Sequence, residues 1–128
     1  MLFESAGAEG RSTVDRCLIG FVAGPPIVSR GYNNNMQIVQ TEGHVMILNE
    51  MVHSAHIIPL SYARETRQLP WVVNSGGHGQ GEALVIETKD FYHHCNEEGI
   101  SEQAVVIEHI RRIDENTLDY DFTVEDPR

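Results

Sequence analysis

The clearest pattern in the chain is a two-residue alternation close to its C-terminal end. Four apolar residues alternate with four polar ones there, the apolar set being Leu118, Tyr120, Phe122 and Val124 and the polar set Asp119, Asp121, Thr123 and Glu125. This period is typical of a strand with one buried face. The preceding segment Ala104–Ile113 is rich in β-branched residues, and Asp114–Thr117 supplies turn residues between the two. The pattern predicts a C-terminal β-hairpin.

Other apolar segments have strand lengths and are separated by Gly, Pro and Asn. The predicted strands are Cys17–Val22, Met36–Gln40, His44–Met51, His53–Ile58, Trp71–Val73 and Ala83–Thr88. One helix competes with this interpretation, at Ser101–Arg112, where Ser101 could serve as an N-cap. Its run of Val and Ile residues favours a strand instead.

Seven or eight short strands with frequent turns predict an all-β protein, either a β-sandwich, a jelly roll or a barrel. We expect a single compact β-sandwich of the jelly-roll or cupin-like kind. The chain has 128 residues with no linker-like segment, so one domain is predicted over residues 1–128, with residues 1–16 as an extended or poorly ordered arm.

The segment from Gln40 to His56 holds three of the seven histidines within strand-like sequence. If Thr41–Gly43 is a three-residue hairpin loop with Gly43 at positive φ, Gln40 lies opposite His44 on one face. A second bend near Met51–Ser54 would return His56 alongside this strand. Whether His53 or His56 then faces His44 depends on a register shift of one residue, which the sequence leaves open.

Several imidazoles on rigid strands form a plausible metal site, because imidazole is a common ligand for zinc, copper, iron and nickel. The candidate ligands are His44, His56, His53 and Gln40. Glu50 could act on a bound substrate or orient a ligand histidine. The competing interpretation is that these histidines are hydrogen-bonded residues of the core, since no tight metal-binding motif is present.

Two further segments are candidate binding sites. The glycine-rich run Gly76–Gly81 lacks the lysine of a phosphate-binding loop, so a flexible loop between strands is predicted there. Tyr32, Asn34 and Trp71 could bind a sugar surface, because aromatic rings stack on sugar faces and amides bind hydroxyls. Core packing is the alternative role for Trp71.

The composition excludes some classes of partner. The net charge of −10 opposes binding to nucleic acid, whose affinity comes largely from cationic side chains. No apolar run has the ~20 residues that cross a bilayer, so no membrane partner is expected. Cys17 and Cys95 allow either one disulfide or two thiols.

Most of the chain resembles a broad group of uncharacterised exported bacterial proteins. The matching blocks are Met36–Gly43, Glu50–His53, Ile57–Leu60, Gly77–Thr88 and Leu118–Pro127. The group usually reads Gly-His-Trp-Glu-Gly-Asp in the glycine block, so Gly79 and Gln80 depart from it. Positions 44 and 56 are more often Tyr and Arg in the group, which makes the two histidines a feature of this chain.

The histidines on a small β scaffold also resemble those of the cellulose oxidative cleaving enzymes, which are cupin-like copper proteins that act as dimers. This resemblance implies a secreted homodimeric oxidoreductase that holds one copper and cleaves cellulose or a related β-glucan by C1 oxidation, using O₂ or peroxide. It implies His44 and His56 as the first copper ligands, with His53 and Gln40 next and Glu50 as a proton donor.

Two other functions stay open. One is a non-catalytic β-sandwich that binds carbohydrate or protein through its tyrosine and asparagine loops, with the histidines packed. The other is a cupin-like iron or manganese enzyme acting on a small molecule, which needs a deep pocket.

Overall fold

The computed structural model describes residues 7, 25–29, 31–61, 73–91 and 100–128. Two antiparallel sheets, one of three strands and one of four, pack on each other, so the prediction of an all-β sandwich is confirmed. Among these residues no helix is long and apolar enough to span a membrane. Most of the predicted arm at residues 1–16, Trp71, both cysteines and the candidate strand Cys17–Val22 lie outside the described residues.

The three-stranded sheet is an antiparallel meander in the central part of the chain. Its strands are β1 (Met36–Gln40), β2 (His44–Asn49) and β3 (Ala55–Pro59), in the order β1-β2-β3. A 3-10 turn, η2 (Met51–His53), joins β2 to β3 and confirms the bend predicted there. Burial alternates along β2, where every second residue from Val45 is buried. The alternation identifies the inner face, which turns toward the other sheet.

The four-stranded sheet is also a meander. Its strands are β4 (Asn74–Gln80), β5 (Ala83–Lys89), β6 (Val105–Arg112) and β7 (Leu118–Glu125), in the order β4-β5-β6-β7. The segment that competed as a helix is therefore a strand, and it pairs on both sides. The predicted C-terminal hairpin is confirmed, with Ile110 opposite Tyr120 and Glu108 opposite Phe122.

The glycine-rich run is strand β4 and not a flexible loop, which corrects the sequence prediction. Its residues pair along the whole of β5. Gly81, with φ 62°, begins the turn between β4 and β5, a conformation that glycine adopts without strain. Gly77 packs against the other sheet, since a Cβ at this position would lie 3.0 Å from Cγ2 of Ile58.

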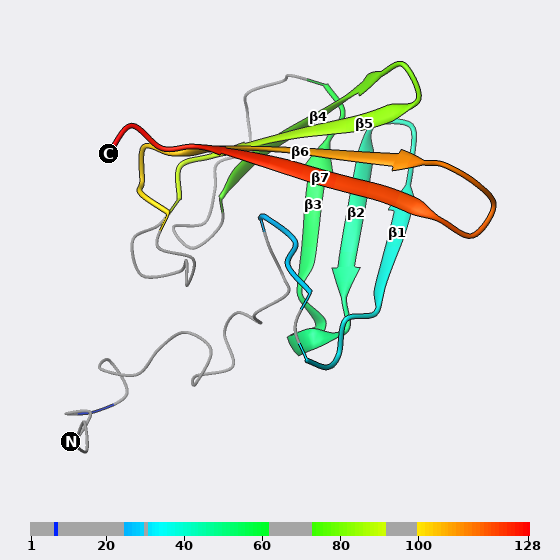
Figure 1. Ribbon diagram of the computed structural model, residues 1–128, viewed down its shortest axis with the longest axis horizontal. Coiled ribbons are helices and arrows are strands. Elements are labelled where there is room, and N and C mark those ends of the chain that lie inside the picture. The colour runs from blue at the N-terminus through cyan, green and yellow to red at the C-terminus, as the bar shows by residue number, and fades with distance from the viewer. Residues whose placement is uncertain (1–6, 8–24, 30, 62–72, 92–99) are drawn as a thin grey trace.

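The strands of the two sheets cross steeply in Figure 1 instead of running alongside each other. β3 and β4 lie next to each other, so the sheets are joined on that side. The core between the sheets is formed by Val45, Ile47, Ile58 and Ile86. A second cluster, formed by Phe91, Ala104 and Val106, lies against Val73 and Ile100. Full burial of each Ile contributes roughly 2 kcal/mol.

Candidate functional site

The hairpin between β1 and β2 differs from its predicted register by one residue. The backbone N–H of Thr41 donates to the carbonyl of His44 at 2.9 Å, and the Thr41 hydroxyl accepts from the N–H of His44. Gln40 therefore pairs with Val45 and not with His44. Gly43 does not take the expected positive φ. The predicted contact between Gln40 and His44 is wrong, because a one-residue shift in register moves side chains to the other face.

His44 and His56 lie on opposite faces of the three-stranded sheet. His56 pairs with Ile47, which is buried on the inner face, while His44 precedes the buried Val45 and is exposed on the outer face. Paired residues of antiparallel strands share a face. Gln40 lies on the inner face with His56, but β2 runs between them. The sheet therefore does not bring the predicted ligands together.

Glu50 precedes the 3-10 turn η2, and His53 is its last residue. His53 is exposed and adopts a left-handed backbone conformation, with φ 52°. One carboxylate oxygen of Glu50, Oε2, accepts a hydrogen bond from Nδ2 of Asn35 at 2.9 Å. Glu50 thus links the bend to the segment that enters β1. Within the described ranges, no group of three or more His, Cys, Asp or Glu side chains could hold a metal ion. The copper site stays a prediction.

A chain of polar side chains instead connects the two sheets at His56. Nε2 of His56 lies 2.8 Å from Oγ of Ser75 on β4, and Oγ of Ser75 lies 2.8 Å from Oγ1 of Thr88 on β5. Thr88 is fully buried and Ser75 nearly so. Burial lowers the pKa of His56 from 6.5 to about 4, so the imidazole is neutral at pH 7. Hydrogen bonding between the sheets accounts for this histidine without a metal.

Asn49 adds a further buried polar group to the inner face near His56. Its side chain is 1% exposed, and neither its amide nitrogen nor its carbonyl oxygen has a hydrogen-bond partner. The backbone N–H of Asn49 donates a hydrogen bond to the carbonyl of Ser54 at 2.8 Å. An unpaired buried amide costs roughly 1–3 kcal/mol.

A buried carboxyl group, Glu108, occupies the inner face of β6. The hydroxyl of Tyr120 donates to Oε1 of Glu108 at 2.7 Å and accepts from the backbone N–H of Ile27 at 2.8 Å. Burial raises the pKa of Glu108, although its hydrogen bonds partly oppose the shift. Desolvation and the neighbouring Glu108 raise the pKa of Tyr120. These contacts attach the segment around Ile27 to the four-stranded sheet, which is a structural role.

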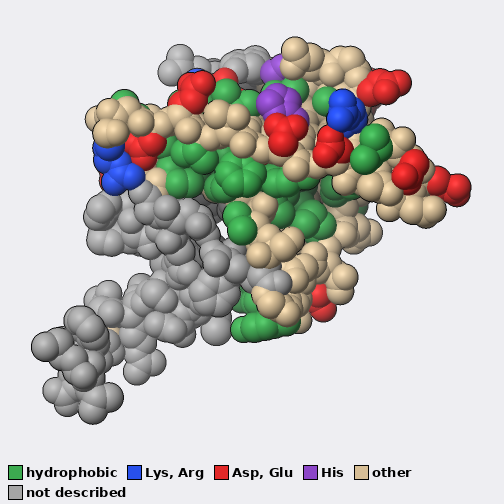
Figure 2. All heavy atoms as spheres, viewed as in Figure 1, with side chains coloured by type: hydrophobic (Ala, Val, Ile, Leu, Met, Phe, Trp, Pro, Cys, Tyr) green, Lys and Arg blue, Asp and Glu red, His purple; other side chains and the backbone are tan. Residues whose placement is uncertain are grey.

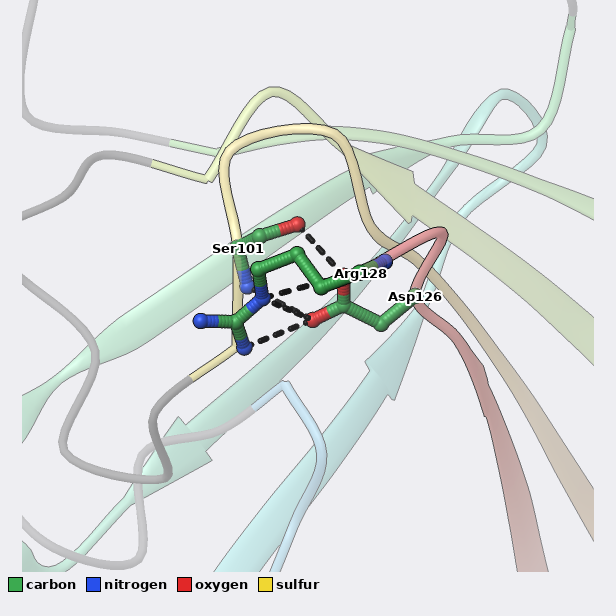
Figure 3. Close-up of polar contacts among 3 residues, drawn as sticks. All are labelled: Ser101, Asp126 and Arg128. Atoms are coloured by element: carbon green, nitrogen blue, oxygen red, sulfur yellow. Dashed lines mark hydrogen bonds and ion pairs between the residues drawn. The ribbon is translucent and has the colours of Figure 1, made fainter.

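A third polar cluster lies where β7 ends (Figure 3). Asp126 accepts hydrogen bonds from the hydroxyl and backbone N–H of Ser101, at 2.7 and 3.0 Å, and pairs with Nη2 of Arg128 at 2.9 Å. The Arg128 guanidinium and the Ser101 donors hold the pKa of Asp126 well below its usual range. The cluster links the start of β6 to the end of β7.

Two shallow grooves flank this third cluster. One, of ≈ 400 Å³, is lined by Gln103, Val105, Glu125, Asp126 and Pro127. The other, of ≈ 370 Å³, is lined mainly by apolar residues, namely Pro26, Val28, Ile100, Phe122 and Val124, together with Asp126 and Arg128. Neither groove includes a residue of the predicted copper site. These two grooves therefore do not provide the deep pocket that an enzyme acting on a small molecule needs.

Comparison of the chain with protein-family models, with curated proteins and with solved structures found no match.

Of the residues predicted to bind sugar, Tyr32 and Asn34 are exposed and precede β1. The side chain of Tyr32 is 64% exposed. Trp71 lies outside the described residues, so the three are not seen as one surface.

Two of the edge strands differ in charge. Within the described ranges β1 and β3 end the three-stranded sheet and β4 and β7 end the four-stranded sheet; β3 and β4 contact each other, and β1 and β7 are the other two. β7 carries carboxylates at Asp119, Asp121 and Glu125, and acidic side chains lie beside its apolar ones in Figure 2. All five residues of β1, Met-Gln-Ile-Val-Gln, are exposed and none is charged. Charged side chains protect an edge from pairing with another chain, and β1 lacks that protection.

Some of these features are visible in the sequence once the strands are placed. Glu108 lies between Val106 and Ile110 at the inner positions of an alternating strand, which is the signal of a buried acid. Ser75 precedes a glycine run that gives no alternation, and the status of β1 as an edge depends on the order of strands in the sheet. Neither could be found from local pattern.

Proposed function

We propose that this protein is a non-catalytic binding module that takes up an extended polypeptide strand along the free edge of β1. The observation that carries the proposal is the contrast between the two edges: β7 bears three carboxylates, while β1 is uncharged and exposed along its whole length. Strand addition of this kind is a recurring mode of peptide recognition, in which backbone hydrogen bonds supply affinity and alternate side chains supply specificity.

The hydrogen bonds between β1 and β2 identify the groups that are available to a partner. The carbonyl of Asn35 accepts from the N–H of Glu50, and the N–H of Thr41 donates to the carbonyl of His44, both at 2.9 Å. Asn35 and Thr41 therefore face β2. Because the direction alternates along an antiparallel strand, Gln37 and Val39 also face β2. The N–H and C=O groups of the other three residues, Met36, Ile38 and Gln40, point toward the free edge.

The side chains of β1 favour a partner without charge. Met36, Ile38 and Val39 are 42%, 37% and 36% exposed, so each has apolar area that a partner would cover. The two glutamines add neutral hydrogen-bonding groups. None of the five side chains is ionisable, which supports binding in preference to chemistry at this edge.

The proposal is tested with a fluorescent peptide of alternating threonine and valine, and with a second peptide that has proline at its centre. Anisotropy should report binding of the first peptide only. Ile38→Pro removes an N–H that faces the free edge, so binding should weaken at least about tenfold. Ile38→Val is the matched control and should bind as the wild type does.

Amide hydrogen exchange of the wild type supplies a measurement that needs no variant. The peptide should slow exchange at Met36, Ile38 and Gln40, while Gln37 and Val39, already bonded to β2, should change little. The proposal is wrong if the alternating peptide does not bind the chain at a concentration where the chain is monomeric, or if it binds and protects amides elsewhere.

A further inference from the structure

We infer that the strand added to β1 is β1 of a second copy, in an antiparallel pair whose two-fold axis passes beside Ile38. This inference rests on the proposed function, since it names the partner of the same edge. The outward backbone groups are those of Met36, Ile38 and Gln40, three alternate residues that are symmetric about Ile38. An edge with this symmetry can pair with itself without leaving any of its outward groups unmatched.

The register follows from this symmetry. With Ile38 opposite Ile38 of the second copy, the two residues exchange both of their backbone hydrogen bonds. Met36 then lies opposite Gln40 of the second copy and exchanges another two, and the symmetric pair does the same. A shift by one residue would place outward groups opposite inward ones, so it would lose these bonds.

The side chains are compatible with the same register. Paired residues share a face, so Met36, Ile38 and Gln40 of both copies line the inner face, and Gln37 lies opposite Val39 on the outer face. No ionisable side chain enters the ladder from either copy. The exposed apolar areas of Met36, Ile38 and Val39 would be covered together.

The charge of the chain selects this edge for self-association. Each copy carries a net charge of −10, and pairing through β7 would bring Asp119, Asp121 and Glu125 close to the same residues of the second copy, although Asp119 pairs with Arg111 and Asp121 bonds His109 on β6. Like charges directly opposite destabilise a strand pair. Of β1 and β7, β1 is the edge strand along which two copies meet without opposed carboxylates, and it lies at the rim of its sheet in Figure 1. Added salt should strengthen the dimer, because it screens the repulsion between the two acidic chains.

Sedimentation equilibrium of the wild-type chain tests the inference, with a dimer expected at twice the chain mass of 14.4 kDa. Ile38→Lys and Ile38→Glu should each weaken self-association at least about tenfold, because the two-fold axis places identical charges opposite each other. Mixing the two variants should restore a dimer that contains one of each. Thr123→Lys, on the β7 edge, is the control and should dimerise as the wild type does.

The outcomes separate this inference from the proposed function. A wild-type chain that stays monomeric while the alternating peptide binds β1 overturns the dimer and leaves the binding module standing. A chain that neither dimerises nor binds the peptide overturns both. A dimer that survives Ile38→Pro uses another surface and also overturns the inference. Folded Lys and Glu variants that do not associate on mixing rule out the register centred on Ile38.

Discussion

His56 makes the stability of the sandwich depend on pH. Burial lowers its pKa from 6.5 to about 4 in the folded protein, where Nε2 lies 2.8 Å from the hydroxyl oxygen of Ser75. Between these two values the unfolded chain binds the proton and the folded chain does not. The contribution to stability is therefore fully present above about pH 6.5 and is lost as the pH falls toward 4.

The size of the effect follows from the two pKa values. A shift from 6.5 to about 4 corresponds to about 3 kcal/mol in the free energy of unfolding over the whole window. At about pH 5, where most of the window has been crossed, the loss is about 2 kcal/mol. This is a large share of the stability of a small domain.

Urea unfolding followed by circular dichroism, at about pH 7.5 and about pH 5, measures this loss. His56→Gln is the matched variant, because its amide can still bond Ser75 but does not titrate. Glu108 acts in the opposite direction, because a raised carboxyl pKa adds stability as the pH falls. Glu108 is present in both proteins, so its effect cancels when the wild type is compared with His56→Gln. The reasoning is refuted if the loss of unfolding free energy between the two pH values differs by less than about 0.5 kcal/mol between the wild type and His56→Gln.

Three further pairs of substitutions test the packing and the hydrogen bonding, and each is measured by urea unfolding. Gly77→Ala should destabilise the fold by roughly 1–2 kcal/mol, because its Cβ would lie 3.0 Å from a methyl group of a buried isoleucine; Gly79→Ala, with nothing within 4 Å, should be close to neutral. Glu108→Ala should cost roughly 2–4 kcal/mol and Glu108→Gln less, because glutamine still accepts the tyrosine hydrogen bond. Val39→Pro should destabilise more than Ile38→Pro, because only the first removes an N–H that faces β2; equal losses would contradict the assignment of the free-edge groups.

The strands were predictable where the sequence alternates or is rich in β-branched residues, although the apolar residues Leu118, Phe122 and Val124 of β7 are exposed and do not form the buried face that their alternation predicted. Alternation located β7, and β-branched residues located β6, since both reflect a local preference that tertiary packing does not override. β4 was missed because its glycines carry no apolar signal. Its pairing is fixed by β5, and Gly77 fits where the sheets approach most closely. Such a requirement comes from a neighbouring sheet and cannot be read from one strand.

The candidate site was harder to predict because it depends on register and strand order. The sequence predicts Gln40 opposite His44, whereas the structure pairs Gln40 with Val45, one residue further along. The hydrogen bond from the N–H of His44 to the Thr41 hydroxyl closes the hairpin in this observed register. The histidines are separated by the register of β3 against β2, in which His56 pairs with the inner-face Ile47 and His44 pairs with Pro59. Placing β1 at an edge further requires knowing that no other described strand lies beyond it.

The steep crossing of the two sheets explains why β1 keeps backbone groups and apolar side chains that a partner strand could cover. Crossed sheets approach closely at one corner and diverge elsewhere. The close corner is at β3 and β4, where Gly77 admits Ile58 and where His56 bonds Ser75. At β1, far from that corner, even the inner-face residues Met36 and Ile38 are 42% and 37% exposed. The geometry that stabilises one side of the sandwich therefore leaves a strand on the other side with both an unpaired backbone and uncovered apolar side chains. A partner strand would satisfy the two together.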